Sequence, residues 1–297
     1  MSKAAQLYRE TADLLGSGAE ARWMLDAAMP HLGIAGQEVP DDVAQELRRM
    51  VARRRAGEPL QYVLGTWAFR TLELRVDRRV LIPRPETEQV VSCALEELRS
   101  AALRPGPTRT RTRTLHAVDL GTGSGAIALS LAAEAGLDGS PPLEVWATDD
   151  SADALAVAGD NLSLLACTDP QSAGRVRLAQ GSWFDALHPG LAGNLDLVVS
   201  NPPYVSAAEW QVLDPVVRDH EPREALVAGD TGREALETIV SLAPHWLAPH
   251  GSLVVELAPH QAEAVAGLAA SCGFAGVEVR SDLAGRPRAL VARRSRE

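Results

Sequence analysis

The sequence predicts an α/β fold with a mostly parallel seven-stranded sheet, preceded by a small all-α region. From about residue 115 onward, short apolar runs of strand length alternate with longer stretches of helical period, which is the pattern of a parallel sheet. Before about residue 57, apolar residues recur at helical spacing between glycine-rich breaks. A glycine-rich turn follows the first strand-like run, where open parallel sheets place their ligands.

The pattern divides the chain into parts that we expect to be separate units. Residues 1–58 predict a helical bundle suited to docking a partner. Residues 59–84 contain an alternating stretch at 71–76, which predicts a β-hairpin linker. Residues 85–297 hold the alternating strands and helices and predict the larger domain.

Positions of strands and helices follow from the same periodicity. Strands are expected at 115–120, 143–149, 175–180, 194–200, 251–257, 275–281 and 288–293. Helices are expected at about 4–15, 20–32, 41–56, 85–103, 124–136, 152–165, 232–247 and 260–272. Residues 104–114 read RPGPTRTRTRT, which predicts a solvated surface loop; contact of its arginines with RNA is the alternative.

Composition and charge exclude several classes of protein. The chain has 297 residues and a formal net charge of −10, which argues against a stable nucleic-acid partner held on a basic surface. The cysteines are scattered and the histidines show no metal-ligand spacing, so we expect neither a disulfide framework nor a metal site. No apolar run reaches the ~18–20 residues of a membrane span. A cytoplasmic protein without membrane association is expected.

The glycine-rich turn reads DLGTGSG over residues 119–125 and predicts a cofactor site. Glycines let the backbone turn tightly and approach a ligand closely. The spacing Gly121, Gly123, Ala126 also fits the dinucleotide fingerprint, so a nicotinamide-dependent oxidoreductase is one alternative. Asp119 favours S-adenosylmethionine instead, because its carboxylate would repel a pyrophosphate but can help hold the ammonium of a methionine moiety, directly or through water.

Two further strand ends carry residues that suit a nucleoside. Asp149 ends the second expected strand, where its carboxylate can accept both ribose hydroxyls. The alternative is that Asp149 caps the helix that follows, and it can serve both purposes; the neighbouring Asp150 offers a second carboxylate. After the third strand, Trp183 and Phe184 can pack on an adenine, and core packing of Phe184 is the alternative.

The fourth expected strand ends in Asn-Pro-Pro-Tyr at residues 201–204. Neither proline has an N–H for the sheet ladder, so the strand stops there, at the ligand-binding edge of the sheet. The side-chain carbonyl of Asn201 and the backbone carbonyl of Pro202 are acceptors, and Pro203 restricts the direction of the second. Tyr204 adds a flat aromatic face. This set suits a planar –NH2 group on an amide or a nucleobase; an ordinary loop is the alternative.

Two other features lie near the same edge of the predicted sheet. LIPRPETE at residues 81–88 predicts either a well-capped helix start or a segment in which Arg84 and the helix start line the ligand site. Glu256 ends a later strand and adds a carboxylate to this edge. We interpret Glu256 as structural rather than catalytic.

With these residues in place, the chain resembles the HemK/PrmC family, the peptide chain release factor N5-glutamine methyltransferases. The resemblance covers nearly the whole chain, including the helical N-terminal region and the hairpin. Its motifs are LIPRPETE at 81–88, DLGTGSGAIALSLA at 119–132, TDDSADAL at 148–155, SNPPYV at 200–205, DPVVRDHEPREAL at 214–226 and DLAGRPRAL at 282–290.

The resemblance implies a Rossmann-like class I S-adenosylmethionine-dependent methyltransferase domain. The family transfers a methyl group from S-adenosyl-L-methionine to the side-chain nitrogen of the glutamine in the Gly-Gly-Gln motif of class I release factors. S-adenosyl-L-homocysteine is the other product, and the modification modulates translation termination. The runner-up function is an amino-methyltransferase acting on adenine or another exocyclic amine of nucleic acid, and a non-catalytic helical adaptor is a third reading.

Matching motifs carry the family's site residues onto this chain. The glutamine would be bound by Asn201, Pro202, Pro203 and Tyr204, with Asn201, Pro202 and Tyr204 as the catalytic set. The cofactor would be bound by Asp119, Gly121, Thr122, Gly123, Ser124, Gly125, Asp149, Trp183 and Asn201. Ser182 departs from the family, where an acidic residue often accepts from the adenine amino group, so that contact would be weaker here.

Overall fold

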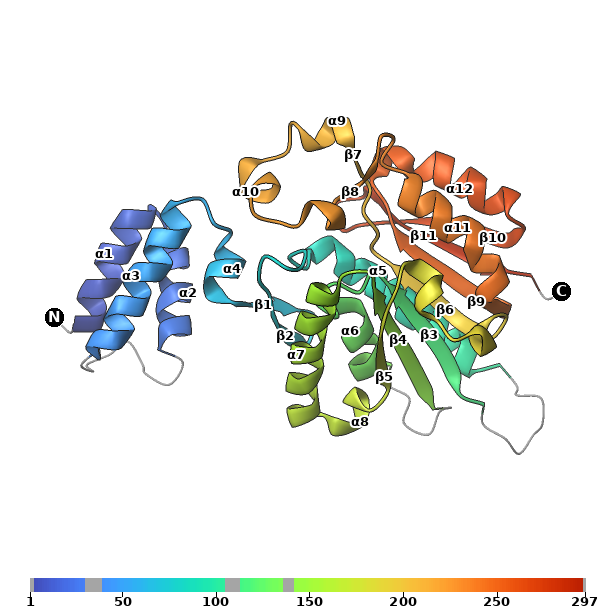
Figure 1. Ribbon diagram of the computed structural model, residues 1–297, viewed down its shortest axis with the longest axis horizontal. Helices are drawn as coiled ribbons and strands as arrows, with labels where there is room; N and C mark the ends of the chain where they lie inside the picture. Colours follow the sequence, from blue (N-terminus) through green and yellow to red (C-terminus); the bar gives the residue numbers. More distant parts are fainter. Residues whose placement is uncertain (1–2, 30–38, 105–112, 136–141, 296–297) are drawn as a thin grey trace.

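The computed structural model describes residues 3–29, 39–104, 113–135 and 142–295 (Figure 1). The expected helix end at 30–32, residue 136 of another expected helix, and residues 105–112 of the arginine-rich segment lie outside the described residues.

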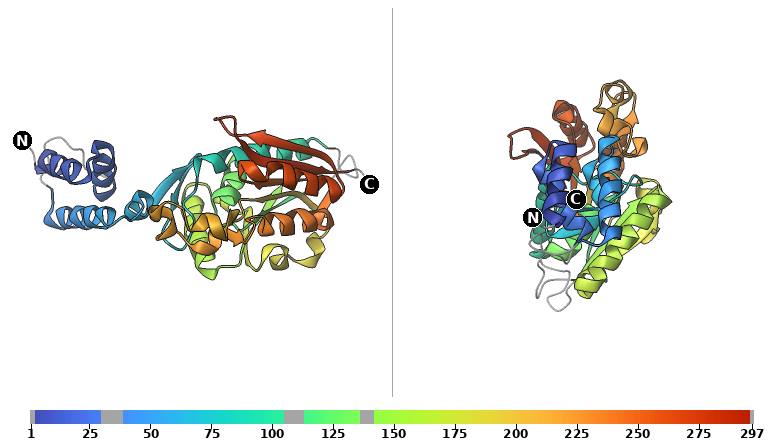
Figure 2. Two further views of the ribbon diagram at one scale, coloured as in Figure 1. Left: turned by 90° about the horizontal axis from the view of Figure 1, so that it is seen from above. Right: turned by 90° about the vertical axis from the view of Figure 1, so that its left-hand side faces the viewer.

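The N-terminal helices form a bundle with its own hydrophobic core. The helices are α1 (Lys3–Leu15), α2 (Gly18–Ala28) and α3 (Asp41–Arg55). Met24, Leu25 and Leu47 are buried in this core, and Ser17 caps α2 by accepting from the backbone N–H of Glu20 at 3.2 Å. Figures 1 and 2 both show the bundle standing away from the rest of the chain.

A short helix and a hairpin join the bundle to the sheet. The elements are α4 (Leu60–Leu64), β1 (Thr66–Phe69) and β2 (Leu72–Arg75). The antiparallel hairpin confirms the prediction, whereas α4 was not predicted. At the hairpin turn, Arg70 pairs with Glu134 through two bonds of 2.9 and 2.7 Å. Asn161 accepts from the N–H of Arg75 at 2.7 Å and donates to the carbonyl of Ser124 at 2.8 Å. The linker is therefore tied to the glycine-rich turn.

Within the described residues, the main sheet has seven strands in the spatial order β10-β11-β9-β6-β3-β4-β5. Their bounds are β3 (Leu115–Leu120), β4 (Leu143–Asp149), β5 (Val176–Gln180), β6 (Leu195–Ser200), β9 (Leu247–Glu256), β10 (Phe274–Ser281) and β11 (Pro287–Arg294). Neighbours from β9 to β5 pair in parallel, and β11 is antiparallel to both β9 and β10. The predicted mostly parallel sheet is confirmed.

Helices cover both faces of this sheet, so its central strands are buried on both sides. The helices are α5 (Pro85–Ala102), α6 (Ala126–Glu134), α7 (Ala152–Thr168), α8 (Pro170–Ala173), α11 (Glu234–Trp246) and α12 (Ala262–Ser271). Along β6, Leu197 and Val199 pack with residues of α5 and α6, and Val198 packs with residues of α11 and α12. This alternation explains why β6 reads as a continuous apolar run in the sequence.

A segment after β6 leaves the sheet and returns to it. It contains β7 (Val205–Ser206), α9 (Ala207–Trp210), α10 (Pro215–Arg218) and β8 (Val227–Gly229). The short 3-10 turn η3 (Arg223–Ala225) also lies in this segment. Other 3-10 turns lie elsewhere in the chain, at η1 (Trp183–Ala186), η2 (Pro189–Leu191) and η4 (Pro259–Gln261). β7 and β8 pair in parallel with each other, an arrangement that the sequence pattern did not predict.

Asp119, near the end of β3, is fully buried and holds the turn that follows. One carboxylate oxygen, Oδ2, accepts from the hydroxyl of Thr122 at 2.6 Å and from the backbone N–H of Ala128 at 3.1 Å. The other oxygen, Oδ1, has no hydrogen-bond partner among the described residues. Burial raises the pKa of Asp119 to about 7, although both hydrogen bonds oppose the rise, and the charge of Asp149 adds to it.

The buried Asp119 should make stability fall as the pH rises. Its ordinary pKa is 3.8 and its folded pKa is about 7, so between these values the folded chain holds a proton that the unfolded chain has lost. We expect the free energy of unfolding of the wild type to fall relative to Asp119→Asn by at most ~1.4 kcal/mol per pH unit, and the difference to level off above about pH 8. Urea denaturation of both proteins from about pH 5 to pH 9 measures this; a constant difference would contradict it.

Candidate active site

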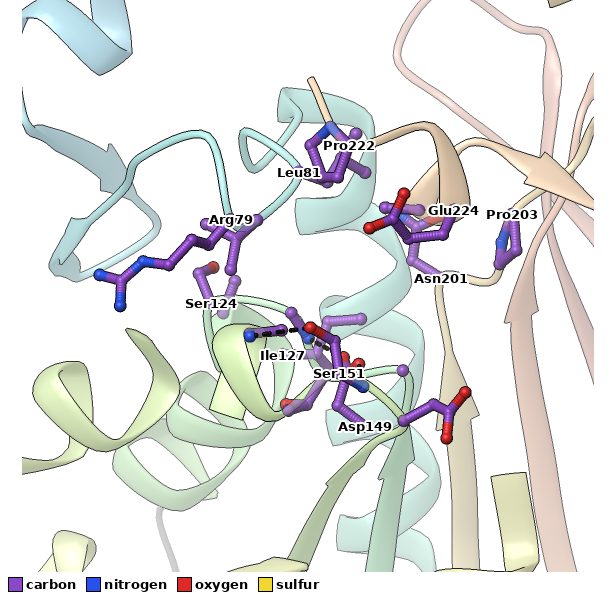
Figure 3. A pocket seen from close by; sticks show the side chains of 18 of the residues that line it. Arg79, Leu81, Ser124, Ile127, Asp149, Ser151, Asn201, Pro203, Pro222 and Glu224 are labelled. Carbon is purple, nitrogen blue, oxygen red and sulfur yellow. Dashed lines mark hydrogen bonds between the residues drawn. The ribbon is translucent and has the colours of Figure 1, made fainter. Parts of the chain in front are cut away.

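A cavity of about 450 Å³ opens at the carboxyl ends of the central strands. Many of the predicted site residues line it: Gly121, Thr122, Gly123, Ser124, Asp149, Trp183, Asn201 and Pro203. Figure 3 shows Asp149 and Ser151 on one side of the cavity and Asn201, Pro203 and Glu224 on the other. The structure therefore brings the glycine-rich turn and the Asn-Pro-Pro-Tyr segment together around a common space.

The other predicted residues lie outside the lining of this cavity. Within the part of the chain that the structure describes, Asp119, Gly125, Pro202 and Tyr204 are not lining residues. Asp119 supports the turn from beneath, as described above. Gly125 starts α6 with a φ of +85°, and a Cβ there would lie 3.1 Å from Leu129. The hydroxyl of Tyr204 points to Glu256, to which it donates at 3.2 Å.

The glycine-rich turn passes close to the end of β4. Gly121 and Gly123 have φ values of +70° and +56°, a region that favours glycine. The backbone N–H of Gly123 donates to Oδ2 of Asp149 at 2.9 Å, and the N–H of Thr122 donates to the carbonyl of Thr148 at 2.8 Å. The turn is thus fixed to β4 in a conformation that exposes its backbone to the cavity.

Asp149 keeps acceptor capacity toward the cavity. Its Oδ2 accepts from Gly123, and its Oδ1 accepts from the backbone N–H of Ser151 at 2.9 Å. A carboxylate oxygen can accept more than one hydrogen bond, so each can still take a hydroxyl. Burial raises the pKa of Asp149, and the two backbone N–H groups oppose this. The cap of α7 is Ser151, which accepts from Ala154, so the alternative that Asp149 caps this helix was wrong.

Trp183 lines the cavity beside the glycine-rich turn. Its φ is +49°, which is unusual for a bulky residue and therefore marks a constrained position. A Cβ added at Gly121 would lie 3.7 Å from the Trp183 ring, so ring and turn are close neighbours. Phe184 is buried and stacks on Trp246 with ring centroids 5.5 Å apart, which confirms its alternative role in the core.

Asn201 belongs to a hydrogen-bonded group at the far side of the cavity. Its Nδ2 donates to the hydroxyl oxygen of Thr87 at 3.2 Å. Thr87 is buried in the first turn of α5 and donates to Oε2 of Glu256 at 2.7 Å. Glu256 is fully buried; burial raises its pKa, which the hydrogen bond from Thr87 and the charge of Arg288 oppose. The sequence did not indicate Thr87 as a site residue.

Arg84 is not among the described residues that line the cavity. Its guanidinium pairs with Glu221 at 2.5 Å, and the same buried carboxylate accepts from the backbone N–H of Ile82 at 3.1 Å. Of the two alternatives for residues 81–88, the helix start contributes to the cavity through Leu81, Pro83 and Thr87 rather than through Arg84. The pair instead fastens the segment before α5 to the segment before β8.

Several lining residues were not predicted from the sequence. The lining residues that were not named from the sequence are Arg79, Val80, Leu81, Pro83, Thr87, Ala126, Ile127, Ser151, Ala154, Gly181, Pro222, Glu224 and Ala225; Asp150 and Ser182, which were named, also line the cavity. Two of the segments could have been found from the sequence. Leu81–Thr87 and Pro222–Ala225 lie within the family motifs at residues 81–88 and 214–226. Among the described residues, the charged side chains of the lining are Arg79, Asp149, Asp150 and Glu224, so carboxylates predominate.

Neither a cluster of metal ligands nor a membrane-spanning helix occurs in the described ranges. No group of three or more His, Cys, Asp or Glu residues there could hold a metal ion. His31 lies outside the described residues. No helix in the same ranges has both the length and the apolar character needed to span a bilayer.

Two family models match the chain. The model described as methyltransferase small domain matches residues 107–220, and the model described as PrmC N-terminal domain matches residues 31–65. The first covers the glycine-rich turn, the end of β4 and the Asn-Pro-Pro-Tyr segment. The second covers α3 and α4, at the start of the linker.

Among solved structures, a methyltransferase from Pyrococcus furiosus superposes with a TM-score of 0.51 at 16% identity, over 82% of this chain and 97% of that one. That likeness confirms the predicted methyltransferase fold.

Curated relatives match over most of their length. The release factor glutamine methyltransferase of Nitratidesulfovibrio vulgaris is 42% identical over 264 residues, which is 86% of this chain and 81% of the relative. The protein of the same name from Geobacter sulfurreducens is 37% identical over 281 residues, 92% of this chain and 88% of the relative. Identity at this level over most of both chains, together with the fold, confirms the resemblance drawn from the motifs: the chain belongs to the release factor glutamine methyltransferase family.

Proposed function

We propose that this protein transfers a methyl group from S-adenosyl-L-methionine to the side-chain nitrogen of the glutamine in the Gly-Gly-Gln motif of class I release factors. The observation that carries the proposal is the position of Asn201 at the cavity, across from Asp149 (Figure 3). Its Nδ2 is taken by Thr87, so Oδ1 is the atom that it offers to a bound molecule. Relatives 36–42% identical carry this activity in their names.

The residues around the cavity fit S-adenosylmethionine. Asp149 has free acceptor capacity for ribose hydroxyls, and the ring of Trp183 offers a face for adenine, with Ser182 beside it. The carboxylates of the lining, together with Asp119 beneath the turn, favour a cationic ligand. The same charges disfavour the pyrophosphate of a nicotinamide dinucleotide. Residues Gly121 to Gly125 would hold the amino-acid end.

Glutamine is a poor nucleophile because the nitrogen lone pair is delocalised into its carbonyl. Oδ1 of Asn201 and the backbone carbonyl of Pro202 would each accept one N–H of the substrate amide, which fixes its rotation and stabilises positive charge on nitrogen. When bound, the cofactor supplies a methyl group on a sulfonium, whose sulfur keeps the electron pair of the broken bond. The nitrogen then loses a proton to water, so the chain needs no strong base. Pro203 and Tyr204 would exclude water from the amide plane.

The arrangement of the chain suits a protein substrate. We propose that the bundle at residues 1–58 docks the release factor, that residues 59–84 link it, and that residues 85–297 carry the reaction. The bundle has its own core and stands away from the sheet, as expected of a separate docking unit (Figures 1 and 2). A release factor works in the cytoplasm, where the reaction would take place.

The substrate is tested directly by mass spectrometry. A purified class I release factor incubated with this protein and S-adenosylmethionine should gain one methyl group on the Gly-Gly-Gln glutamine. A release factor with that glutamine changed to glutamate serves as the control and should gain none. Bound cofactor without methylation of the factor would contradict the substrate and direct the search to the amino groups of nucleic acids.

Removal of the side-chain acceptor should impair the transfer step. For Asn201→Ala we expect kcat to fall by about 10²- to 10³-fold, the usual effect of losing one group that stabilises developing charge. Cofactor affinity, measured by calorimetry, should change within a few-fold, because Asp149 and the turn remain. Turnover close to that of the wild type would rule out the model with two acceptors.

The two adjacent carboxylates at the end of β4 should differ in their effect on cofactor binding. Asp149→Asn loses charge-assisted hydrogen bonds to hydroxyls, so we expect the dissociation constant to rise about 10- to 100-fold. Asp150→Asn is the matched control, because Asp150 lines the cavity but is exposed. Calorimetric titration of both variants gives the comparison; equal effects would refute the assignment of the ribose contact to Asp149.

A further inference from the structure

Glu256 sets the direction of the hydrogen bonds around Asn201. Its carboxylate is fully buried at the end of β9, with Oε2 2.7 Å from the hydroxyl of Thr87 and Oε1 3.2 Å from that of Tyr204. Burial raises the pKa of Glu256, and the guanidinium of Arg288, 3.9 Å from Oε1, opposes this rise and favours the ionised form. An ionised carboxylate accepts hydrogen bonds and donates none, so both hydroxyls must donate to it.

The hydrogen bond from Thr87 to Glu256 determines the direction of the hydrogen bond between Thr87 and Asn201. A threonine hydroxyl has one proton, and Thr87 gives it to Glu256. Toward Asn201 the Thr87 oxygen can therefore only accept, which requires the amide NH2 of Asn201 to face it at 3.2 Å. If the Asn201 amide were rotated by half a turn, Oδ1 would face the lone pairs of Thr87 and the NH2 would face the cavity. An NH2 group there would repel an incoming substrate –NH2.

We propose that Thr87 and Glu256 are positioning residues that hold Oδ1 of Asn201 toward the substrate amide; this inference rests on the proposed function. The series Glu256–Thr87–Asn201 connects β9, the first turn of α5 and the end of β6. The same carboxylate orients the hydroxyl of Tyr204. One buried charge thus fixes the hydrogen-bond polarity of Asn201 and Tyr204, two of the residues assigned to the glutamine.

The first test removes the acceptor and keeps the shape of the side chain. Thr87→Val should lower kcat about 10- to 100-fold, since the Asn201 amide loses its fixed orientation. Cofactor affinity by calorimetry should stay within threefold of the wild type. Thr87→Ser keeps the hydroxyl and should restore kcat to within about threefold. Wild-type kcat in Thr87→Val, or failure of serine to rescue, would overturn the positioning role.

Ser252→Ala is the matched control. Ser252 on β9 donates to Glu97 on α5 at 2.6 Å, so it joins the same two elements by the same chemistry, away from the cavity. Both variants lose a buried hydroxyl, and we expect similar losses in thermal stability. Unchanged kcat in Ser252→Ala beside a reduced kcat in Thr87→Val separates positioning from stability. Equal losses of kcat would refute the proposal.

Glu256→Gln provides a second variant in case Thr87→Val does not fold. Glutamine can donate as well as accept, so Thr87 is no longer forced to accept from Asn201. We expect a lower kcat with little change in KM for the cofactor. Groups facing Glu256 are Thr87 and Glu86 on α5, Tyr204 after β6 and Arg288 on β11.

The pH profile gives a further readout. Protonation of Glu256 would free Thr87 in the wild type, so kcat should fall on the acid side, and Glu256→Gln should lack this limb. An identical acid limb in both proteins would count against the proposal.

A readout without turnover uses the side-chain amide of Asn201. In 15N-labelled protein without cofactor, its protons should exchange slowly in the wild type and faster in Thr87→Val; equal exchange would contradict the bond. A wild type that does not methylate the release factor would refute the proposed function and leave this exchange result unaffected. The two proposals therefore fail separately.

Discussion

A carboxylate removed from water must be satisfied by hydrogen-bond donors, and the loops of this protein are shaped around such groups. Asp119 near the end of β3, Asp149 at the end of β4 and Glu256 at the end of β9 each accept from groups on other segments. The ends of parallel strands meet at one edge, so these bonds converge on one cavity. The sheet is rigid, and hydrogen bonds to its carboxylates fix the positions of the glycine-rich turn and of Asn201 relative to it.

The same principle links segments far apart in the chain. Glu221 joins the segment before α5 to the segment before β8 through Arg84 and the N–H of Ile82. The cavity is therefore lined from several directions: residues 79–87 precede or start α5, residues 222–225 precede β8, and the strand ends form the base. Burying a carboxylate with its donors costs free energy of desolvation, but once formed the hydrogen bonds permit few alternative arrangements of the groups that they join.

Sequence patterns anticipated the parts of this architecture that depend on local periodicity. The strands of the main sheet and the longer helices α6, α7, α11 and α12 were placed within a few residues, because apolar spacing reports burial directly, whereas the short helices α8, α9 and α10 were not predicted. The roles of residues whose partners lie far away in the sequence could not be predicted from local patterns. Thr87 meets Glu256 across 169 positions and Asn201 across 114, and no local pattern encodes such a meeting. The sequence left Asp149 open as a cap of α7 because Asp149 and Ser151 both carry suitable oxygens, and only the backbone geometry identifies Ser151 as the cap.

The hydrophobic core of the N-terminal bundle is separate from the cores on the two faces of the sheet. A bundle of this size buries a smaller fraction of its surface than the large domain, so we expect it to be the less stable unit. From these separate cores we expect two unfolding transitions rather than one, which a single melting temperature would not describe. On heating, we expect the bundle to unfold first, while the sheet and the cavity at its edge keep their structure.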